Sequence, residues 1–353
     1  MEAEDGSELC FPQLQNTSCR KPAVLWHEAV LPFFLMSLST LTVALNLLVI
    51  ISVSYFRQLH TPTNILILSL AVSDFIVGLL LLPVEIILKL SCWFLGDLAC
   101  SLFNYMAFIV TSASVGNMVL ISMDRYVSIC DPMHYTARVT VNRVRLCVCM
   151  CWLGSVSYSG IFARDRLSQP GKYNSCHGEC VVFIDYVSGT VDLVLTCVLP
   201  VTVIIVLYVR VFSVAATQAR AMRSQISVVT HRLAAGSKTM RSELKAARTL
   251  GLVVVLFLLC FCPYYAVSLA GDNTLSSSYV SFVLYLFYLN SCLNPLIYAL
   301  FYPWFRKAVK SILTLRLLFP HSQGSDLPAV PGRTIADDGC NMCSIAKLSS
   351  AGR

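Results

Sequence analysis

Charged residues are scarce in this sequence. Lys, Arg, Asp and Glu together make up 13% of its 353 residues, whereas soluble domains carry about a quarter. Hydrophobic residues account for 56%, against roughly half or less in an average soluble domain. These two values exclude an ordinary soluble domain and indicate a chain that lies in lipid.

Histidine is also scarce, with six residues in the whole sequence. His27 and His60 flank long apolar segments, and the others fall in loops or in the tail. A membrane-embedded hydrolase would need a nucleophile with a base, or a His-rich metal set, inside the apolar segments. The sequence offers neither, so we do not expect an enzyme.

Long apolar runs are what the sequence does contain. Seven runs reach about 18 residues, the length at which a helix can cross a bilayer; they are 29–55, 63–88, 99–130, 146–163, 187–212, 246–270 and 278–302. A helix satisfies its own backbone hydrogen bonds, as hydrocarbon requires. We therefore expect an all-α membrane protein, a seven-transmembrane helix bundle over residues 29–302. The stretch MEAEDGSELC lacks the basic region of a cleaved signal peptide, so the first span is expected to act as the membrane signal.

Lys and Arg gather in the segments that join alternate spans. The connection between the fifth and sixth spans is the richest, with Arg210, Arg220, Arg223, Arg232, Lys238, Arg241, Lys245 and Arg248. The positive-inside rule then places residues 1–28 outside the cell and the C-terminus inside. Asn16, in the sequon NTS, falls on the outer side and is expected to carry a glycan. The net charge of +7 is a sign of this topology and not of nucleic-acid binding.

Two different segments follow the last span. Residues 303–318 alternate apolar and basic side chains, which predicts an amphipathic helix at the membrane interface. Residues 319–353 are polar and contain proline, which predicts a disordered cytoplasmic tail. Acylation of Cys340 or Cys343 stays open, because both lie far from the end of the helix.

Polar residues inside the spans form a short, ordered series. A charge at the centre of a span costs about 2.5–3.5 kcal/mol, so each one is a functional candidate. The series runs through Asn46, Asp74, MDRYVSI at 123–129, Trp152, Pro200, Tyr208, FLLCFCPYY at 257–265 and NSCLNPLIYALFYPWF at 290–305. A membrane transporter, the alternative from another class, would instead show charged or broken helices paired across two halves.

This series resembles that of the rhodopsin-like G-protein-coupled receptors across all seven spans. NSCLNPLIYALFYPWFRKAV at 290–309 is similar to the seventh span of the trace amine-associated receptors, as are the outer NTSC and CHGEC. The resemblance implies a multi-pass plasma-membrane receptor for amines that detects volatile amines in olfaction. It also implies a heterotrimeric G protein of the stimulatory or olfactory type that raises cyclic AMP, with arrestin and a receptor kinase as further partners.

The resemblance implies a ligand aspartate on the third span, seven residues after Cys100, but this sequence has Ala107 there. The usual salt bridge to the ligand ammonium therefore cannot form. Asp192 supplies a carboxylate on the fifth span, eight residues and roughly 12 Å before Pro200, on the same helix face as Thr196. This arrangement is similar to the branch of the family, abundant in bony fishes, that binds amines through the fifth span. Alternatively, Asp192 faces a water-filled vestibule or bonds a neighbouring Tyr or Thr.

Aromatic side chains are expected to complete the pocket, because ring faces attract an ammonium and pack against hydrocarbon. The resemblance points to Phe108, Thr111, Phe261, Tyr264, Tyr265 and Tyr288. Phe261 stands where many relatives have tryptophan below the ligand. The remaining alternative is a receptor of the same fold for another amine or a non-amine ligand. Whether one or two ammonium groups bind is open: Glu85 or Asp185 could hold a second, although Glu85 can equally pair with Lys89.

Deeper polar residues are spaced like a cluster that holds a structural sodium ion, and no other cofactor is expected. They are Asn46, Asp74, Ser114, Asn290, Ser291 and Asn294, whose oxygen atoms suit a hard cation. A hydrogen-bonded network without an ion is the alternative.

At the inner face, the DRY-type motif Asp124, Arg125 and Tyr126 is expected to control coupling. Arg125 should pair at rest with Asp124 and with Glu243 of the sixth span. Tyr208 and Tyr298 should stabilise the open form, in which a groove admits the C-terminal helix of the G protein.

Six cysteines lie on the predicted outer side, where disulfides persist; they are Cys10, Cys19, Cys92, Cys100, Cys176 and Cys180. By resemblance, Cys100 should bridge Cys180, and Cys176 should bridge the N-terminal segment through Cys19 rather than Cys10. A metal site in CHGEC is disfavoured, because no second pair of ligands is in sight.

Overall fold

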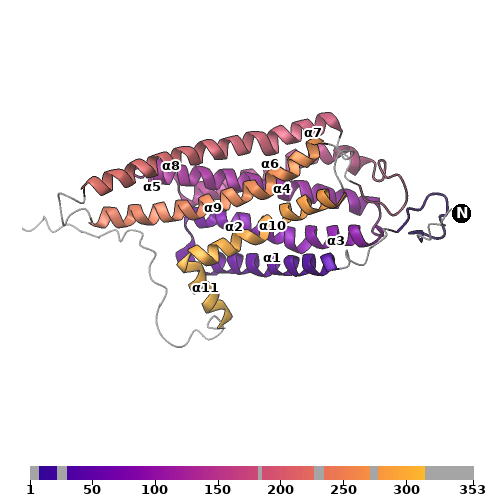
Figure 1. Ribbon diagram of the computed structural model, residues 1–353, viewed down its shortest axis with the longest axis horizontal. Helices are drawn as coiled ribbons and strands as arrows, with labels where there is room; N and C mark the ends of the chain where they lie inside the picture. Colours follow the sequence, from indigo (N-terminus) through magenta and orange to yellow (C-terminus); the bar gives the residue numbers. More distant parts are fainter. Residues whose placement is uncertain (1–7, 22–29, 182–184, 226–233, 271–276, 315–353) are drawn as a thin grey trace, which may run out of the picture.

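The computed structural model describes residues 8–21, 30–181, 185–225, 234–270 and 277–314. Within these ranges, seven helices are long and apolar enough to cross a membrane: Leu31–Tyr55, Pro62–Leu90, Asp97–Cys130, Val141–Ser168, Tyr186–Thr217, Thr249–Val267 and Tyr279–Phe301. They lie side by side along the long axis of the molecule (Figure 1). The predicted all-α bundle of seven spans is confirmed.

The described residues form both long and short helices. The long ones are α1 (Val30–Tyr55), α2 (Pro62–Ile76), α3 (Leu82–Leu90), α4 (Asp97–Cys130), α6 (Val141–Ser168), α8 (Leu199–Gln225), α9 (Ala234–Ala270), α10 (Ser277–Phe301) and α11 (Pro303–Leu313). The short ones are η2 (Arg57–Leu59), η3 (Val77–Leu81), α5 (Tyr135–Arg138), α7 (Tyr186–Asp192) and η4 (Leu193–Val198). Side chains fix some of the starts: Thr61 and Thr140 accept hydrogen bonds from the N–H groups of Asn64 and Arg143.

Two spans contain a π-helical turn. In the second span, η3 joins α2 to α3; in the fifth, η4 joins α7 to α8. A π turn holds an extra residue, so side chains on either side of it no longer follow the regular helical spacing. The second turn begins directly after Asp192, so the expected alignment of Asp192 above Pro200 on one regular helix does not hold. Gly78 in η3 allows close packing on α1, where its carbonyl accepts a 2.7 Å hydrogen bond from Ser39 Oγ.

Three disulfides join the described outer segments. Cys100–Cys180 and Cys19–Cys176 are the pairings that the resemblance implies. The third, Cys10–Cys92, was not predicted; it ties the N-terminal segment to the loop before α4. The sequence indicates this pairing only by elimination, because Cys10 and Cys92 remain once the other four outer cysteines are paired. Asn16 is exposed on the segment between Cys10 and Cys19.

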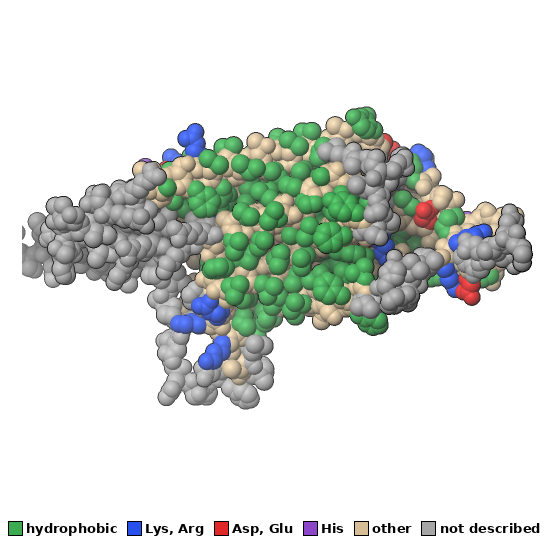
Figure 2. Space-filling model, in the orientation of Figure 1, with side chains coloured by type: hydrophobic (Ala, Val, Ile, Leu, Met, Phe, Trp, Pro, Cys, Tyr) green, Lys and Arg blue, Asp and Glu red, His purple; other side chains and the backbone are tan. Residues whose placement is uncertain are grey.

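At the other end of the bundle, α11 turns away from α10 (Figure 1). Phe305 and Ala308 are buried against the bundle, whereas Arg306, Lys307 and Lys310 are exposed. The predicted amphipathic helix is therefore present, and its described part ends at Leu313. Figure 2 shows hydrophobic side chains over the middle of the visible face and a group of Lys and Arg beside α11.

Candidate ligand-binding site

A cavity of about 510 Å³ lies among the spans near their outer ends. It is lined by Glu85, Phe103, Asn104, Ala107, Phe108, Thr111, Ser112, Asp185, Tyr186, Gly189, Thr190, Asp192, Leu193, Thr196, Tyr264, Tyr265, Leu284, Phe287 and Tyr288. Three of these side chains are carboxylates, and none of the described lining residues is Lys, Arg or His. A cleft with one sign of charge and low-dielectric walls concentrates counter-ions, so the cavity favours a cation.

Most of the residues expected to bind ligand lie on this wall. Asp192, Phe108, Thr111, Thr196, Tyr264, Tyr265 and Tyr288 all line the cavity. Phe261 does not: it is buried beneath the cavity, with its ring centroid 4.8 Å from that of Phe257 and 5.5 Å from that of Phe287. Phe287 itself lines the cavity and was missed, because no motif marks it.

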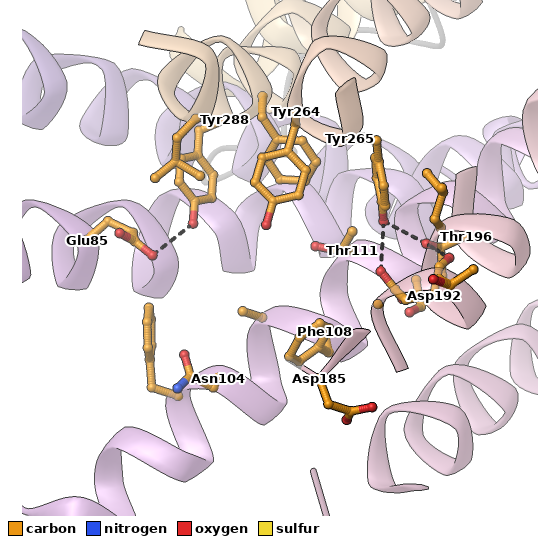
Figure 3. A pocket seen from close by; sticks show the side chains of 18 of the residues that line it. Glu85, Asn104, Phe108, Thr111, Asp185, Asp192, Thr196, Tyr264, Tyr265 and Tyr288 are labelled. Carbon is orange, nitrogen blue, oxygen red and sulfur yellow. Dashed lines mark hydrogen bonds between the residues drawn. The ribbon is translucent and has the colours of Figure 1, made fainter. Parts of the chain in front are cut away.

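Asp192 lies at one end of the labelled residues, beside Tyr265 and Thr196 (Figure 3). Its Oδ1 accepts a 2.8 Å hydrogen bond from the hydroxyl of Tyr158, and its Oδ2 accepts a 3.4 Å bond from the hydroxyl of Tyr265. The Tyr265 hydroxyl also lies 2.6 Å from Thr196 Oγ1. Asp192 thus both lines the cavity and bonds neighbouring hydroxyls. Tyr158, on α6, was missed, because its contact depends on which face of α6 meets the fifth span.

The third span presents an apolar surface to the cavity. Ala107 lines it and packs against a buried cluster that includes Phe103, Val110 and Tyr288. No carboxylate comes from α4, since Asp97 and Asp124 lie at its two ends. The acidic groups of the cavity therefore come from the second and fifth spans and from the loop before α7.

The two other carboxylates have different surroundings. Glu85, on α3, accepts a 3.3 Å hydrogen bond at Oε1 from the hydroxyl of Tyr288. Lys89, one turn further on, donates from Nζ to Ser281 Oγ at 3.2 Å. Asp185 is exposed and caps α7 by accepting the N–H of Ser188 at 3.0 Å. That backbone hydrogen bond holds the pKa of Asp185 below its usual value.

The deeper polar residues come together around Asp74, which is completely buried. Its Oδ2 accepts a 2.8 Å hydrogen bond from Asn294 Nδ2, and Asn46 Nδ2 donates to the carbonyl of Ser291 at 3.0 Å. Four buried oxygens here have no hydrogen-bond partner among the described residues: the Oδ1 atoms of Asp74, Asn46, Asn290 and Asn294. Ser114 is half-buried on α4. A set of buried oxygen atoms that accept no hydrogen bond from the described residues fits a hard cation such as sodium.

Arg125 lies at the inner end of α4 and is almost fully buried. Its Nη2 is 2.5 Å from Asp124 Oδ2. Asp124 also accepts 2.8 Å hydrogen bonds from Thr63 Oγ1 and from the hydroxyl of Tyr135. Burial raises the pKa of Tyr135, which keeps this hydroxyl protonated as a donor. Thr63 and Tyr135 were missed by sequence reasoning, because neither belongs to a motif.

The other residues expected to act at the inner face differ in how exposed their side chains are. Tyr126 is exposed, whereas Tyr208 and Tyr298 are buried. The buried hydroxyls of Tyr208 and Tyr298 have no hydrogen-bond partner among the described residues. Glu243 falls within α9, but its side chain lies outside the described part of the chain, so its pairing with Arg125 stays a prediction.

Comparison with known proteins agrees with this geometry. Residues 45–298 match the family described as 7 transmembrane receptor (rhodopsin family), a family of receptors and not of enzymes. The chain is 35% identical to trace amine-associated receptor 13c of Danio rerio, over 92% of this chain and 97% of that one. It is 31% identical to trace amine-associated receptor 4 of Mus musculus, over 92% and 96%, and 35% identical to trace amine-associated receptor 1 of Macaca mulatta, over 84% and 92%. The chain therefore belongs to the rhodopsin family of seven-transmembrane receptors and, within it, to the trace amine-associated receptors.

Proposed function

We propose that this multi-pass plasma-membrane receptor detects amines through Asp192, with its N-terminus outside the cell. The observation that carries the proposal is the cavity itself, which has carboxylates on its wall and no Lys, Arg or His among its described lining residues. Its relatives are named as trace amine-associated receptors. An olfactory role is part of the proposal and rests on the family alone.

The proposed contact is an ion pair between the ligand ammonium and the Asp192 carboxylate. The hydroxyls of Tyr158 and Tyr265 orient this carboxylate, and each oxygen keeps a lone pair for the ligand. A charge-assisted hydrogen bond in a partly dry site is stronger than its equivalent in water. The ring faces of Phe108 and Tyr264 then attract the same cation and pack against its hydrocarbon part.

Activation is proposed to follow from preferential binding to one state of the bundle. A ligand shifts the equilibrium only by its difference in affinity for the two states. Tyr265 and Phe261 lie on α9 between the cavity and the inner half of that helix, with ring centroids 5.0 Å apart. We propose that their movement releases Arg125 and opens a groove for a G protein of the stimulatory or olfactory type, which raises cyclic AMP. Arrestin and a receptor kinase are proposed to act on the same face.

A ligand panel tests the proposal directly. In cells that express the receptor, primary amines should raise cyclic AMP, whereas alcohols with the same carbon skeleton should require at least about 100-fold higher concentrations. The reason is that an alcohol cannot replace the charge that a desolvated carboxylate needs. Cells without the receptor are the control. Equal potency of an amine and its alcohol would instead favour a receptor of this fold for a non-amine ligand.

The deeper cluster is proposed to hold a sodium ion. Asp74 would supply the charge, and oxygens of Asn46, Ser114, Asn290 and Asn294 would complete the ligands. If so, replacing sodium by choline should increase agonist potency several-fold in the wild type, and Asp74→Asn should remove this dependence. Asp97→Asn is the matched control, because Asp97 bonds Asn174 at the outer surface. A sodium effect that persists in Asp74→Asn would leave a hydrogen-bonded network without an ion.

A further inference from the structure

We propose that the preferred ligands are diamines, with two ammonium groups joined by an apolar chain. Glu85 and the Tyr288 hydroxyl would form the second cation subsite, at the opposite end of the cavity from Asp192. This inference rests on the proposed function and deepens it, since it adds a subsite that the Asp192 contact does not require.

Glu85 has the chemistry of a cation subsite. Its side chain is partly buried in the cavity wall, and its one described hydrogen bond is the 3.3 Å contact from the Tyr288 hydroxyl. An ionised carboxylate can accept about four hydrogen bonds, so an ammonium can still bind. A desolvated carboxylate without a cation is costly, and no Lys, Arg or His is among the described residues that line this cavity. A cationic group of the ligand would supply the missing charge.

The other neighbouring charges do not take this role. Lys89, one turn further along α3, lies close enough to act on Glu85 through its charge, but its Nζ donates to Ser281 Oγ, 3.2 Å away, and it does not line the cavity. Asp185 is exposed and is occupied in capping α7. Glu85 is therefore the partly buried carboxylate that remains for a second ammonium.

The wall between the two carboxylates suits an apolar tether. Figure 3 places Glu85 with Tyr288 at one end of the labelled residues and Asp192 with Tyr265 at the other, with Tyr264, Thr111 and Phe108 between them. Ala107, Leu284 and Phe287 add apolar surface to the same cavity. Methylene groups packed against such a wall lose contact with water. Because position 107 is alanine, α4 adds no charge to this wall.

The test compares each n-alkyl monoamine with the α,ω-diamine of the same carbon number, from three to eight carbons. Cyclic AMP dose-response curves are measured in wild type, Glu85→Gln, Tyr288→Phe and Asp192→Asn, with surface expression measured by labelling intact cells. In the wild type, diamines of one preferred length should be at least about ten-fold more potent than their monoamines. Glu85→Gln should raise the diamine EC50 by about 10- to 100-fold and the monoamine EC50 by less than about three-fold.

Two variants control for fold and for long-range charge. Tyr288→Phe keeps the ring and removes only the hydroxyl, and it should weaken diamines selectively by about three- to ten-fold. Glu179→Gln makes the same chemical change as Glu85→Gln in the outer loop, where Glu179 bonds Ser175 and does not line the cavity. Its diamine response should match the wild type.

The outcomes separate the two proposals. If Glu85→Gln weakens monoamines and diamines equally, or if wild-type diamines are no more potent than monoamines, the Glu85 subsite is wrong. An equal loss of diamine potency in Glu179→Gln would also overturn it. The loss would then come from the total negative charge of the outer side and not from a subsite at Glu85. If Asp192→Asn leaves both ligand series unchanged, the proposed function itself fails.

Discussion

In the Asp192→Ala receptor, we expect the amine response to disappear, with an EC50 at least about 100-fold higher, while surface expression persists. Removing one partner of a desolvated charge pair costs about 2–5 kcal/mol, and about 1.4 kcal/mol corresponds to a factor of ten. The bundle should tolerate the change, because Asp192 faces a cavity and not the packed core. The measurement is a cyclic AMP dose-response curve normalised to surface receptor.

Two further variants separate charge from hydrogen bonding at this position. Asp192→Asn keeps an acceptor for the hydroxyls of Tyr158 and Tyr265 but removes the charge, so it should lose nearly as much potency as alanine. Tyr158→Phe removes the 2.8 Å hydrogen bond and keeps the carboxylate, so it should cost only a few-fold. An unchanged curve in Asp192→Ala would refute the contact. An equal loss in Tyr158→Phe and Asp192→Ala would show that geometry, and not charge, is what matters.

The second large effect is expected at the inner face, where Asp124→Asn should raise ligand-free cyclic AMP about ten-fold. Asp124 accepts hydrogen bonds from Thr63, Arg125 and Tyr135. Its negative charge holds Arg125, and hydrogen bonds to charged groups contribute about 1.5–3 kcal/mol. Loss of that amount from the closed state shifts the ratio of open to closed receptor by about 10- to 100-fold. Basal cyclic AMP per surface receptor is the readout.

Asp131→Asn is the matched control for this experiment. Asp131 lies one helical turn beyond Val127 at the end of α4 and pairs with His134 and Arg138. The hydrogen bond from His134 lowers the pKa of Asp131, so this residue is also a carboxylate at neutral pH. Its partners are exposed, and exposed ion pairs contribute little, so basal signalling should not change. Normal basal signalling in Asp124→Asn, or an equal rise in Asp131→Asn, would contradict the role given to Asp124.

The spans and the helix after them could be predicted because hydrophobicity along the chain needs no knowledge of packing. The π turns could not, since each changes the helix by one residue without a sequence signal of its own. The turn after Asp192 is an example. The predicted distance of roughly 12 Å from Asp192 to Pro200 assumes a regular helix with 1.5 Å per residue, and η4 interrupts that helix. Helix existence is thus easier to predict than the direction of a side chain.

The candidate site was partly predictable for a related reason. Asp192 stood out as an acid in an apolar span, and the resemblance supplied the aromatic residues of α4, α9 and α10. Tyr158 donates to Asp192, and Thr63 and Tyr135 donate to Asp124. Such contacts between helices depend on helix rotation, which one sequence does not determine. Phe261 packs below the cavity, where the resemblance places a tryptophan in many relatives, and its contact with a ligand stays a prediction.

The bridges Cys10–Cys92 and Cys19–Cys176 fasten one short segment to two separate outer loops, and Cys100–Cys180 fastens the second of these loops to α4. Because these covalent links form one connected frame, neither loop can swing aside without moving the other. The loop that contains Cys176 and Cys180 is therefore tied both to α4 and to the N-terminal segment, so it cannot move away from α4 as an independent unit.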